Sequence, residues 1–374
     1  MKTRAAVLRD MKPAKPYSVS RPLEVVNLDL DSPGPEEVLI RIRAAGLCHS
    51  DLSVINGNRP RPMPMALGHE AAGEVVSLGD NVDDLSSGDH VILTFVPSCG
   101  HCLPCAEGRP ALCEPGAKTN NAGTLLSGGI RLREDLSPVH HHLGCSAFAE
   151  YAVVSRRSLV KIDEDLPFIE AALFGCAVLT GVGAVINTAK LQAGQTTAVI
   201  GLGGVGLAAL LGAIGAGASE VIAVDISDEK LAVAREMGAT ETVNATDKHA
   251  IEKIRDLTRG GVDIALEFAG SEKALEDAYR MTRRGGITVT AGLPAPHVNL
   301  PVNVVSLVAE ERTLKGSYIG ACVPIRDISR YVALYRAGKL PVNKLLSGVI
   351  SLSEINEGFD RLDRGEAIRL VVEL

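Results

Sequence analysis

Short apolar runs separated by Gly, Pro and Asp dominate roughly the first 175 residues of the chain. In segments 37–45 and 88–96, apolar residues alternate with polar ones, which is the pattern of strands with one buried face. Segment 114–149 is rich in Gly, Ser, Asn and His, and we expect a long irregular loop there. Loops of that length are uncommon in compact domains unless they serve a function.

Strands and helices alternate from about residue 177 to residue 314. Predicted strands begin at Thr196, Glu220, Glu241, Val262 and Gly286, a sixth lies near Thr313, and helical segments separate them. This alternation predicts a doubly wound parallel sheet. Beyond it we expect a helix and short strands that return to the first domain. The sequence therefore divides into three predicted parts, 1–177, 178–317 and 318–374.

Composition excludes several classes of protein. With 46% hydrophobic and 22% charged residues and a net charge of −7, the chain has the balance of a folded globular protein without general attraction to nucleic acid or anionic lipid. Segments 171–189 and 191–219 lack charges, but glycines interrupt both, and we interpret them as buried elements and not membrane spans. The N-terminal residues lack the apolar stretch of a secretory signal, so we expect a cytoplasmic protein.

A glycine loop follows the strand predicted at Thr196. Residues Gly201, Gly203, Gly204, Val205 and Gly206 supply a G-x-G-x-x-G motif at the start of a helix. Such a loop lets a pyrophosphate approach backbone N–H groups at the helix N-terminus. Asp225 follows Gly206 by 19 residues, where a carboxylate favours the ribose of NAD over the 2′-phosphate of NADP. The alternative is an ordinary glycine-rich turn with a surface Asp.

The cysteines form one cluster and several isolated positions. Cys99, Cys102, Cys105 and Cys113 have the spacing of a closed structural Zn²⁺ site, with redox pairing as the alternative. Cys48, His69 and Cys176 could give a second Zn²⁺ three ligands and one open position, but spacing alone equally allows buried cysteines and a core histidine. We expect the run His140–His142 to be an exposed loop and not a further metal site.

Together these motifs resemble those of zinc-dependent alcohol dehydrogenases of the medium-chain dehydrogenase/reductase family. The resemblance rests on segment 68–73 with Gly79 and Val82, on the cysteine cluster, on the glycine loop and on Asp225. It extends over essentially the whole chain. It implies an α/β fold with a GroES-like, β-rich catalytic domain and a doubly wound Rossmann cofactor domain.

The resemblance also implies a reaction and a set of site residues. The reaction is reversible oxidation of a primary alcohol to the aldehyde, with hydride transfer from a zinc-bound alkoxide to NAD. Each chain would hold one catalytic and one structural Zn²⁺. The resemblance assigns the catalytic zinc to Cys48, His69 and Cys176, with Glu70 close by. Asp51 would orient His69, and Ser50 would take the alcohol proton. It assigns further cofactor contacts to His49, Thr180, Lys230 and Arg369. It places Phe95, His142 and Leu143 in the walls of the substrate pocket.

The chain departs from the family pattern in two places. Ser53 stands where many relatives end the proton relay with a histidine, so the relay could finish through Ser53, His49 or water. Arg59 and Ala117 stand where the glutathione-dependent formaldehyde branch places its glutathione-binding residues, which weakens that alternative. A non-catalytic NAD-binding or redox-sensing protein on the same fold is the other alternative. The resemblance implies a small-molecule alcohol or aldehyde substrate and a homodimer or homotetramer.

Overall fold

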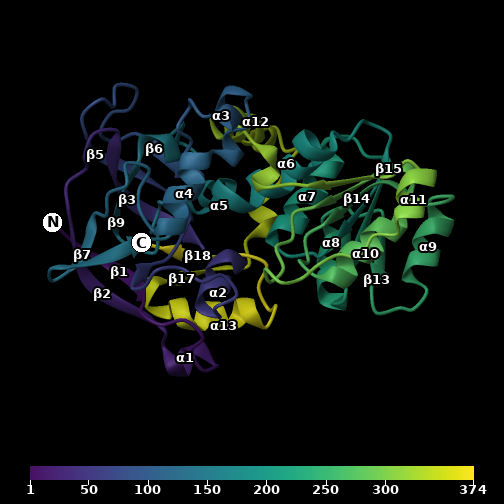
Figure 1. The fold of residues 1–374 in the computed structure, drawn as a ribbon, viewed down its shortest axis with the longest axis horizontal. Helices are drawn as coiled ribbons and strands as arrows, with labels where there is room; N and C mark the ends of the chain where they lie inside the picture. The colour runs from purple at the N-terminus through teal and green to yellow at the C-terminus, as the bar shows by residue number, and fades with distance from the viewer. The chain divides into compact units, whose positions relative to one another are not determined.

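The computed structural model describes residues 1–374, and the chain folds into two compact units (Figure 1). The first unit contains Met1–Cys176, Val323–Ser329 and Leu346–Leu374. The second contains Ala177–Cys322 and Arg330–Leu345. Helix α12 (Pro324–Arg336) therefore begins in the first unit and ends in the second.

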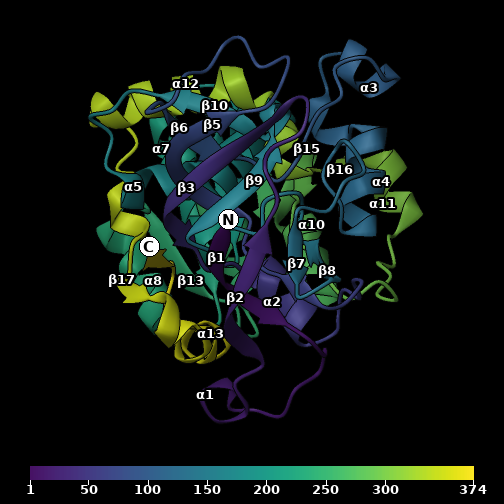
Figure 2. The same ribbon diagram turned by 90° about the vertical axis from the view of Figure 1, so that its left-hand side faces the viewer.

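A small closed barrel and a seven-stranded sheet form the first unit; strands of both are labelled in Figure 2. The barrel has the order β1-β2-β7-β8-β4, with strands β1 (Lys2–Leu8), β2 (Leu23–Leu30), β4 (Met65–Ala66), β7 (Leu132–Glu134) and β8 (Ser137–His141). The sheet has the order β10-β6-β5-β3-β18-β17, with β9 also paired to β3. Its strands are β3 (Glu37–Gly46), β5 (Glu70–Leu78), β6 (His90–Leu93), β9 (Tyr151–Ser155), β10 (Leu159–Ile162), β17 (Gly348–Ser351) and β18 (Leu370–Glu373).

Short helices complete the first unit. They are α1 (Tyr17–Ser20), α2 (His49–Ile55), α3 (Leu103–Ala106), α4 (Glu114–Ala122), α5 (Phe168–Leu173) and α13 (Ile355–Asp363). The β-rich first domain predicted from the sequence is confirmed. The prediction of an irregular loop over 114–149 is wrong, because this segment contains α4 and the antiparallel pair β7–β8. Polar residues there form the helix surface and the hairpin, and Val139 and Leu132 turn into the barrel core.

The second unit is the predicted doubly wound parallel sheet. Its order is β13-β12-β11-β14-β15-β16, and every pair is parallel. The strands are β11 (Thr196–Ile200), β12 (Glu220–Asp225), β13 (Glu241–Asn244), β14 (Val262–Glu267), β15 (Thr282–Thr290) and β16 (Thr313–Gly316). The helices are α6 (Leu179–Gly183), α7 (Gly204–Gly215), α8 (Asp228–Glu236), α9 (Ala250–Leu257), α10 (Glu272–Met281) and α11 (Val304–Ala309). The strand order reverses beside β11, and ligands of such sheets bind at this reversal.

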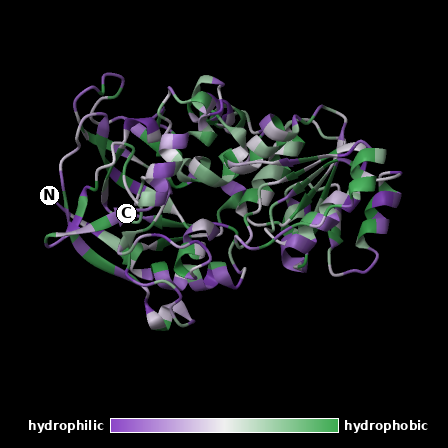
Figure 3. Cartoon of the chain, viewed as in Figure 1, coloured by the Kyte–Doolittle hydropathy of each residue, from purple (hydrophilic) through white to green (hydrophobic).

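Burial follows the hydrophobic pattern of this sheet. Residues 221–225 of β12 are all buried, as are residues 264–267 of β14, because helices cover parallel strands on both faces. The outer helices alternate hydrophobic and hydrophilic positions (Figure 3). In α9, for example, Ile254 is fully buried among strand residues while Glu252, two positions earlier and on the other side of the helix, is exposed.

One helical segment, Phe168–Ala189, is long and apolar enough to cross a membrane by length and composition. However, 78% of its most apolar window is buried inside the protein. Core helices of folded proteins have the same composition, so the segment needs no membrane to explain it.

The carboxylate of Asp263 ties β14 to the first residue of β11. It accepts hydrogen bonds from the Thr196 backbone N–H (2.8 Å), from the Thr196 hydroxyl (2.9 Å) and from Arg283 Nε (2.8 Å). Burial opposes ionisation, but the Thr196 and Arg283 hydrogen bonds outweigh it and lower the pKa of Asp263. The carboxylate therefore stabilises the folded unit when it is ionised.

We predict that Asp263→Asn lowers the free energy of unfolding by about 1–3 kcal/mol at pH 7. The side-chain NH₂ group of the asparagine would have to face either Thr196 or Arg283, both of which donate hydrogen bonds to the carboxylate. A group with a lowered folded-state pKa contributes stability that is present above its unfolded pKa and is lost as pH falls through the folded value. In urea titrations the gap between variant and wild type should be constant from pH 7 to pH 5 and shrink below about pH 4. A gap that is absent at pH 7, or that persists unchanged in acid, would contradict this account.

Candidate active site

Three side chains from separate parts of the first unit meet at one buried point. Cys48 immediately precedes α2, His69 immediately precedes β5, and Cys176 follows α5 in a helical segment. Strands β3 and β5 are antiparallel with Gly46 opposite Glu70, and this register brings Cys48 beside His69. One ligand atom of each of the three side chains lies within 4.8 Å of the others, and all three residues are buried.

Gly68 determines how the chain enters the site at His69. Its φ is +95°, in the left-handed region that residues with a Cβ disfavour. A Cβ at this position would lie 2.4 Å from the backbone nitrogen of Phe148. Glycine is therefore required both by the backbone angle and by the close approach of a neighbouring strand segment.

The donor atoms fit a zinc ion. Nδ1 of His69 faces Asp51, and the opposite nitrogen, Nε2, is buried without a hydrogen-bond partner in the protein. A buried imidazole nitrogen without a partner is costly unless a ligand uses its lone pair. Two thiols and one imidazole match the three protein ligands of a catalytic Zn²⁺ site.

The carboxylate of Asp51 fixes the orientation of His69. Its Oδ1 lies 3.2 Å from His69 Nδ1 and accepts a hydrogen bond from the Gly68 N–H at 3.1 Å. Although full burial opposes ionisation, the charge of His69 and a hydrogen bond from His142 lower the pKa of Asp51 to about 2. A carboxylate in this position holds the imidazole with its proton on Nδ1, which leaves Nε2 free for the metal.

Glu70 and Arg369 form a buried ion pair beside the thiols. Glu70 Oε2 lies 3.4 Å from Arg369 Nη2, and Arg369 Nη1 donates to the Leu47 carbonyl at 2.8 Å. Burial raises the pKa of Glu70 to about 7, against the opposing charge of Arg369. The pKa of Cys48 is lowered by a hydrogen bond with Cys176 and by the charge of Arg369, and that of Cys176 is raised. The guanidinium is thus already engaged, and its contact with a cofactor pyrophosphate stays a prediction.

Helix α2 carries the predicted proton-relay residues. Ser50 is partly exposed and His49 is exposed in its first turn. The Ser53 hydroxyl donates to the His49 carbonyl at 2.8 Å, so its proton is held by the helix backbone. Ser53 is therefore poorly placed to end a relay by donating its own proton.

The expectation that His140–His142 form an exposed loop is wrong. His141 and His142 are each only 1% exposed, because β8 pairs with β4 and β7 and turns this run into the barrel. His141 Nε2 accepts a hydrogen bond from the Arg131 N–H at 3.0 Å, and burial lowers the pKa of His141 to about 4. His142 instead lies against Asp51, with Nδ1 3.0 Å from Oδ1.

The predicted pocket walls surround His69. The rings of Phe95 and His142 both meet the His69 ring edge-on, with centroids 5.2 Å and 5.3 Å away. Phe95 and Leu143 are each 8% exposed, so a small part of each faces accessible space. The structure thus brings Phe95 and His142 to the candidate zinc site, whereas their contact with substrate stays a prediction.

The clustered cysteines make a second candidate metal site. The four sulfur atoms lie within 4.8 Å of one another, and none of the eight cysteines of the chain forms a disulfide. Backbone N–H groups point at two of the sulfurs: Cys99 N lies 3.2 Å from Cys113 Sγ, and Cys102 N lies 3.3 Å from Cys99 Sγ. Such N–H groups stabilise thiolates, and backbone hydrogen bonds from His101 and Cys102 lower the pKa of Cys99 to about 7 against its partial burial. Four thiolates suit a closed structural Zn²⁺ site.

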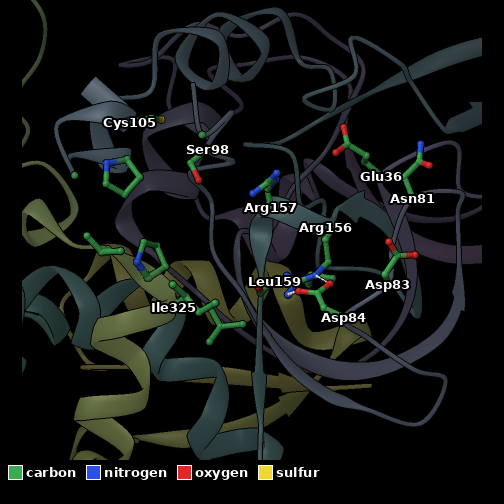
Figure 4. Close-up of a pocket in the computed structure, with 16 residues that line it drawn as sticks. Glu36, Asn81, Asp83, Asp84, Ser98, Cys105, Arg156, Arg157, Leu159 and Ile325 are labelled. Carbon is green, nitrogen blue, oxygen red and sulfur yellow. Dashed lines mark hydrogen bonds and ion pairs between the residues drawn. The ribbon is translucent and has the colours of Figure 1, made fainter. Parts of the chain in front are cut away.

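A cavity of about 500 Å³ lies beside the cysteine cluster (Figure 4). Its lining includes Cys105 and Arg157, and the Arg156–Asp84 ion pair borders it. Cys48, His69 and Cys176 do not line it. It is therefore separate from the candidate catalytic site.

In the second unit, the glycine loop joins β11 to α7. Gly201 has φ +88°, and a Cβ on Gly206 would lie 1.8 Å from the Gly201 carbonyl oxygen. A Cβ on Gly203 would meet nothing within 4 Å. The first N–H groups of α7 have no acceptor within the helix, so the open space at Gly203 fits the pyrophosphate of a nicotinamide cofactor.

Asp225 ends β12 and holds this loop directly. Its Oδ2 accepts a hydrogen bond from the Leu202 N–H at 2.6 Å, and its Oδ1 accepts one from the Ser227 N–H at 3.1 Å. The carboxylate is 8% exposed. Lys230 in α8 and Thr180 in α6 are partly buried in the same unit, and their cofactor contacts stay predictions.

Sequence reasoning missed Glu267, which organises two loops at the same end of the sheet. It is 1% exposed, and its carboxylate accepts hydrogen bonds from the Gly270 N–H (2.5 Å) and the Thr290 hydroxyl (2.6 Å). The Cβ of a residue at Gly201 would lie 2.6 Å from Ala269 N, so these loops border the glycine loop. An acidic residue directly after the apolar run 264–266 was the available signal.

Two family models match the chain. The alcohol dehydrogenase GroES-like domain covers residues 34–164, and the zinc-binding dehydrogenase domain covers residues 204–336. The chain is 38% identical over 376 residues to a putative alcohol dehydrogenase D of Mycobacterium tuberculosis, with complete coverage of both. It is 36% identical over 382 residues to S-(hydroxymethyl)glutathione dehydrogenase of Paracoccus denitrificans, again with complete coverage.

Solved structures agree. Benzyl alcohol dehydrogenase from Acinetobacter calcoaceticus has a TM-score of 0.93 at 32% identity, covering 100% of this chain and 99% of that one. A putative zinc-binding dehydrogenase from Sinorhizobium meliloti bound to NADP has a TM-score of 0.82 at 27% identity, with complete coverage of both. The chain belongs to the zinc-dependent alcohol dehydrogenases of the medium-chain dehydrogenase/reductase family. It is accordingly an oxidoreductase that uses zinc and a nicotinamide cofactor.

We predict that substitutions at two glycines of the loop both weaken cofactor binding but differ in their effect on stability. Gly203→Ala places a methyl group in open space, so the melting temperature should stay within about 2 °C of wild type while cofactor affinity falls about tenfold or more, as measured by NADH fluorescence titration. Gly206→Ala forces its Cβ against the Gly201 carbonyl, so this variant should lose stability as well as cofactor binding. If Gly203→Ala bound the cofactor normally, the loop would not be the pyrophosphate site.

Proposed function

We propose that this protein catalyses the reversible, NAD-dependent oxidation of a primary alcohol to its aldehyde. The observation that carries the proposal is the convergence of Cys48, His69 and Cys176 around the unpartnered Nε2 of His69. These three residues would hold the catalytic zinc, and Cys99, Cys102, Cys105 and Cys113 would hold a structural one. When bound, the catalytic zinc acts as a Lewis acid that lowers the pKa of the alcohol.

The side chains around the site can be assigned to orienting the zinc ligand and to moving the alcohol proton. Asp51 keeps the His69 proton on Nδ1. The Ser50 hydroxyl, on the partly exposed first turn of α2, accepts the alcohol proton and passes it toward solvent beside His49. We assign no terminal role to Ser53, because its proton is engaged by the His49 carbonyl.

The cofactor and substrate classes follow from neighbouring residues. Asp225 presents a carboxylate at the end of β12 and is followed by exposed Ile226 and then Ser227, without an arginine to receive a 2′-phosphate. NAD is therefore favoured. Phe95 makes an apolar wall against His69, which suits aliphatic, allylic or aromatic primary alcohols. The similarity to a benzyl alcohol dehydrogenase supports the aromatic class.

Glutathione-dependent formaldehyde oxidation is the second candidate. The relative from Paracoccus denitrificans, named for S-(hydroxymethyl)glutathione, favours it. Two positions disfavour it. Arg59 and Ala117 stand where the glutathione-dependent branch has an acidic residue and an arginine that contact glutathione.

We further propose a homodimer or homotetramer in the cytoplasm. On α11, Val304, Val305 and Val308 are 68%, 76% and 71% exposed, and β16 is the last strand of its sheet. An exposed apolar helix face beside an unpaired strand edge is suited to a second copy of the chain. The eight free cysteines are consistent with a reducing compartment.

The first test is NADH formation at 340 nm with a panel of primary, secondary and benzylic alcohols, offered with NAD or NADP. We expect turnover with NAD on primary alcohols, and no stimulation of formaldehyde oxidation by glutathione. Ser50→Ala should lower kcat about 10²-fold or more by removing the proton acceptor, whereas Ser53→Ala on the same helix should stay within about threefold. Glutathione stimulation would favour the second candidate, and equal losses in the two serine variants would refute the relay assignment.

The role of Asp225 is tested separately. Asp225→Asn retains an oxygen for the Leu202 N–H but removes the negative charge, so the preference for NAD over NADP should fall by about tenfold. Asp225→Arg should reverse the preference, since a cation there attracts the 2′-phosphate. The measurement is kcat/KM with each cofactor, and the glycine loop is monitored by the melting temperature. An unchanged ratio in both variants would show that another residue selects the cofactor.

A further inference from the structure

Asp51 is contacted by two imidazoles, although orienting one metal ligand requires only one. Its Oδ1 lies 3.2 Å from His69 Nδ1 and 3.0 Å from His142 Nδ1, and it also accepts the Gly68 N–H at 3.1 Å. Its Oδ2 is buried and has no hydrogen-bond partner. The Gly68 N–H and His69 Nδ1 make hydrogen bonds with Oδ1, whereas His142 Nδ1, which is buried and has no other partner, meets it at ion-pair distance.

His142 is itself held firmly. Its side chain is 2% exposed, and its backbone N–H lies within hydrogen-bond distance of the Ser146 hydroxyl (3.1 Å) and of the Ala66 carbonyl (3.3 Å). Its ring meets the His69 ring at 90° with centroids 5.3 Å apart. The backbone of His142 is thus held beside the end of β8, and its buried ring packs against that of His69.

The arrangement fixes the protons on both rings. A carboxylate oxygen at hydrogen-bond distance favours the proton on the facing nitrogen, which is Nδ1 in His69 and in His142. His69 then offers its Nε2 lone pair toward Cys48 and Cys176. If the carboxylate of Asp51 rotated toward its unpartnered Oδ2, it would lose alignment with His69, and His142 opposes that rotation.

We propose that His142 is a positioning residue that holds Asp51 in place, and through it His69, so that the catalytic zinc is retained. The inference rests on the proposed assignment of that zinc to Cys48, His69 and Cys176. His142 acts from the barrel, whereas His69 and Asp51 belong to the segments beside β5 and in α2. The zinc site is accordingly coupled to the packing of β8 through the contacts of His142 with Asp51 and with the His69 ring.

Two substitutions separate this contact from simple packing. His142→Phe keeps a ring of similar size and removes the nitrogen that faces Asp51. His142→Asn loses most of the ring, but its amide nitrogen can take nearly the place of Nδ1 and face the same oxygen. If His142 only fills space, zinc release from the Phe variant should resemble that from wild type. If His142 positions Asp51, zinc release from the Asn variant should resemble wild type instead.

The measurement is zinc content and the rate of zinc release from the holoenzyme to a chromogenic chelator. Wild type should hold two zinc ions per chain and release them in two phases, and the phase missing from Cys48→Ala identifies the catalytic ion. We expect release from this site to be about three- to tenfold faster in His142→Phe and within about twofold of wild type in His142→Asn. Release from the cysteine cluster is the internal control and should not change in either variant.

The outcomes distinguish this inference from the proposed function. One zinc ion per wild-type chain, or no phase lost in Cys48→Ala, would overturn the site assignment and this inference with it. Two ions with equal release rates in wild type and His142→Phe would overturn the role of His142 alone. Faster release from both sites would indicate general destabilisation, and a third ion lost in His142→Phe would indicate that Asp51, His69 and His142 bind metal directly; either result refutes the positioning role.

Discussion

The antiparallel pairing of β3 with β5 is the constraint on which the candidate active site depends. Because Gly46 lies opposite Glu70, the two chain segments that leave this pair present Cys48 and His69 to the same point. A shift of one residue in register would turn His69 to the other face of the sheet. Gly68 makes the entry possible, since its φ of +95° and the nearby Phe148 backbone exclude a side chain there.

Burial makes this site electrostatically demanding. Asp51, Glu70 and the two thiols are buried together, and the fixed positive charge of Arg369 lies 3.4 Å from Glu70. Burial raises the pKa of Glu70 to about 7, and the pKa of Cys176 is raised as well. Further negative charge is therefore unfavourable in this site. A divalent cation held by the thiols and His69 would relieve the same imbalance, because buried charges are stable only when paired. Zinc held by these residues would therefore also stabilise the folded first unit.

Local patterns were sufficient for much of the fold. The strands of the second unit and the glycine loop were predicted correctly, because periodicity and turn residues act over short distances. The histidine run was not, since the burial of His141 and His142 depends on how β8 pairs with β4 and β7. The convergence of Cys48, His69 and Cys176 could be anticipated only through family resemblance, as residues so far apart in sequence have no local signal for proximity.

The carboxylates that sequence reasoning undervalued share one physical role. Asp225 and Glu267 end strands of the second unit, and each accepts a backbone N–H from a neighbouring loop. Asp51 does the same for Gly68 in the first unit. A buried acceptor that satisfies a loop N–H removes the cost of an unpaired donor and fixes the loop at once. Residues selected for ligand contact in a motif can thus also be required for the shape of the loop that makes the contact, and substitutions there must be separated into the two effects.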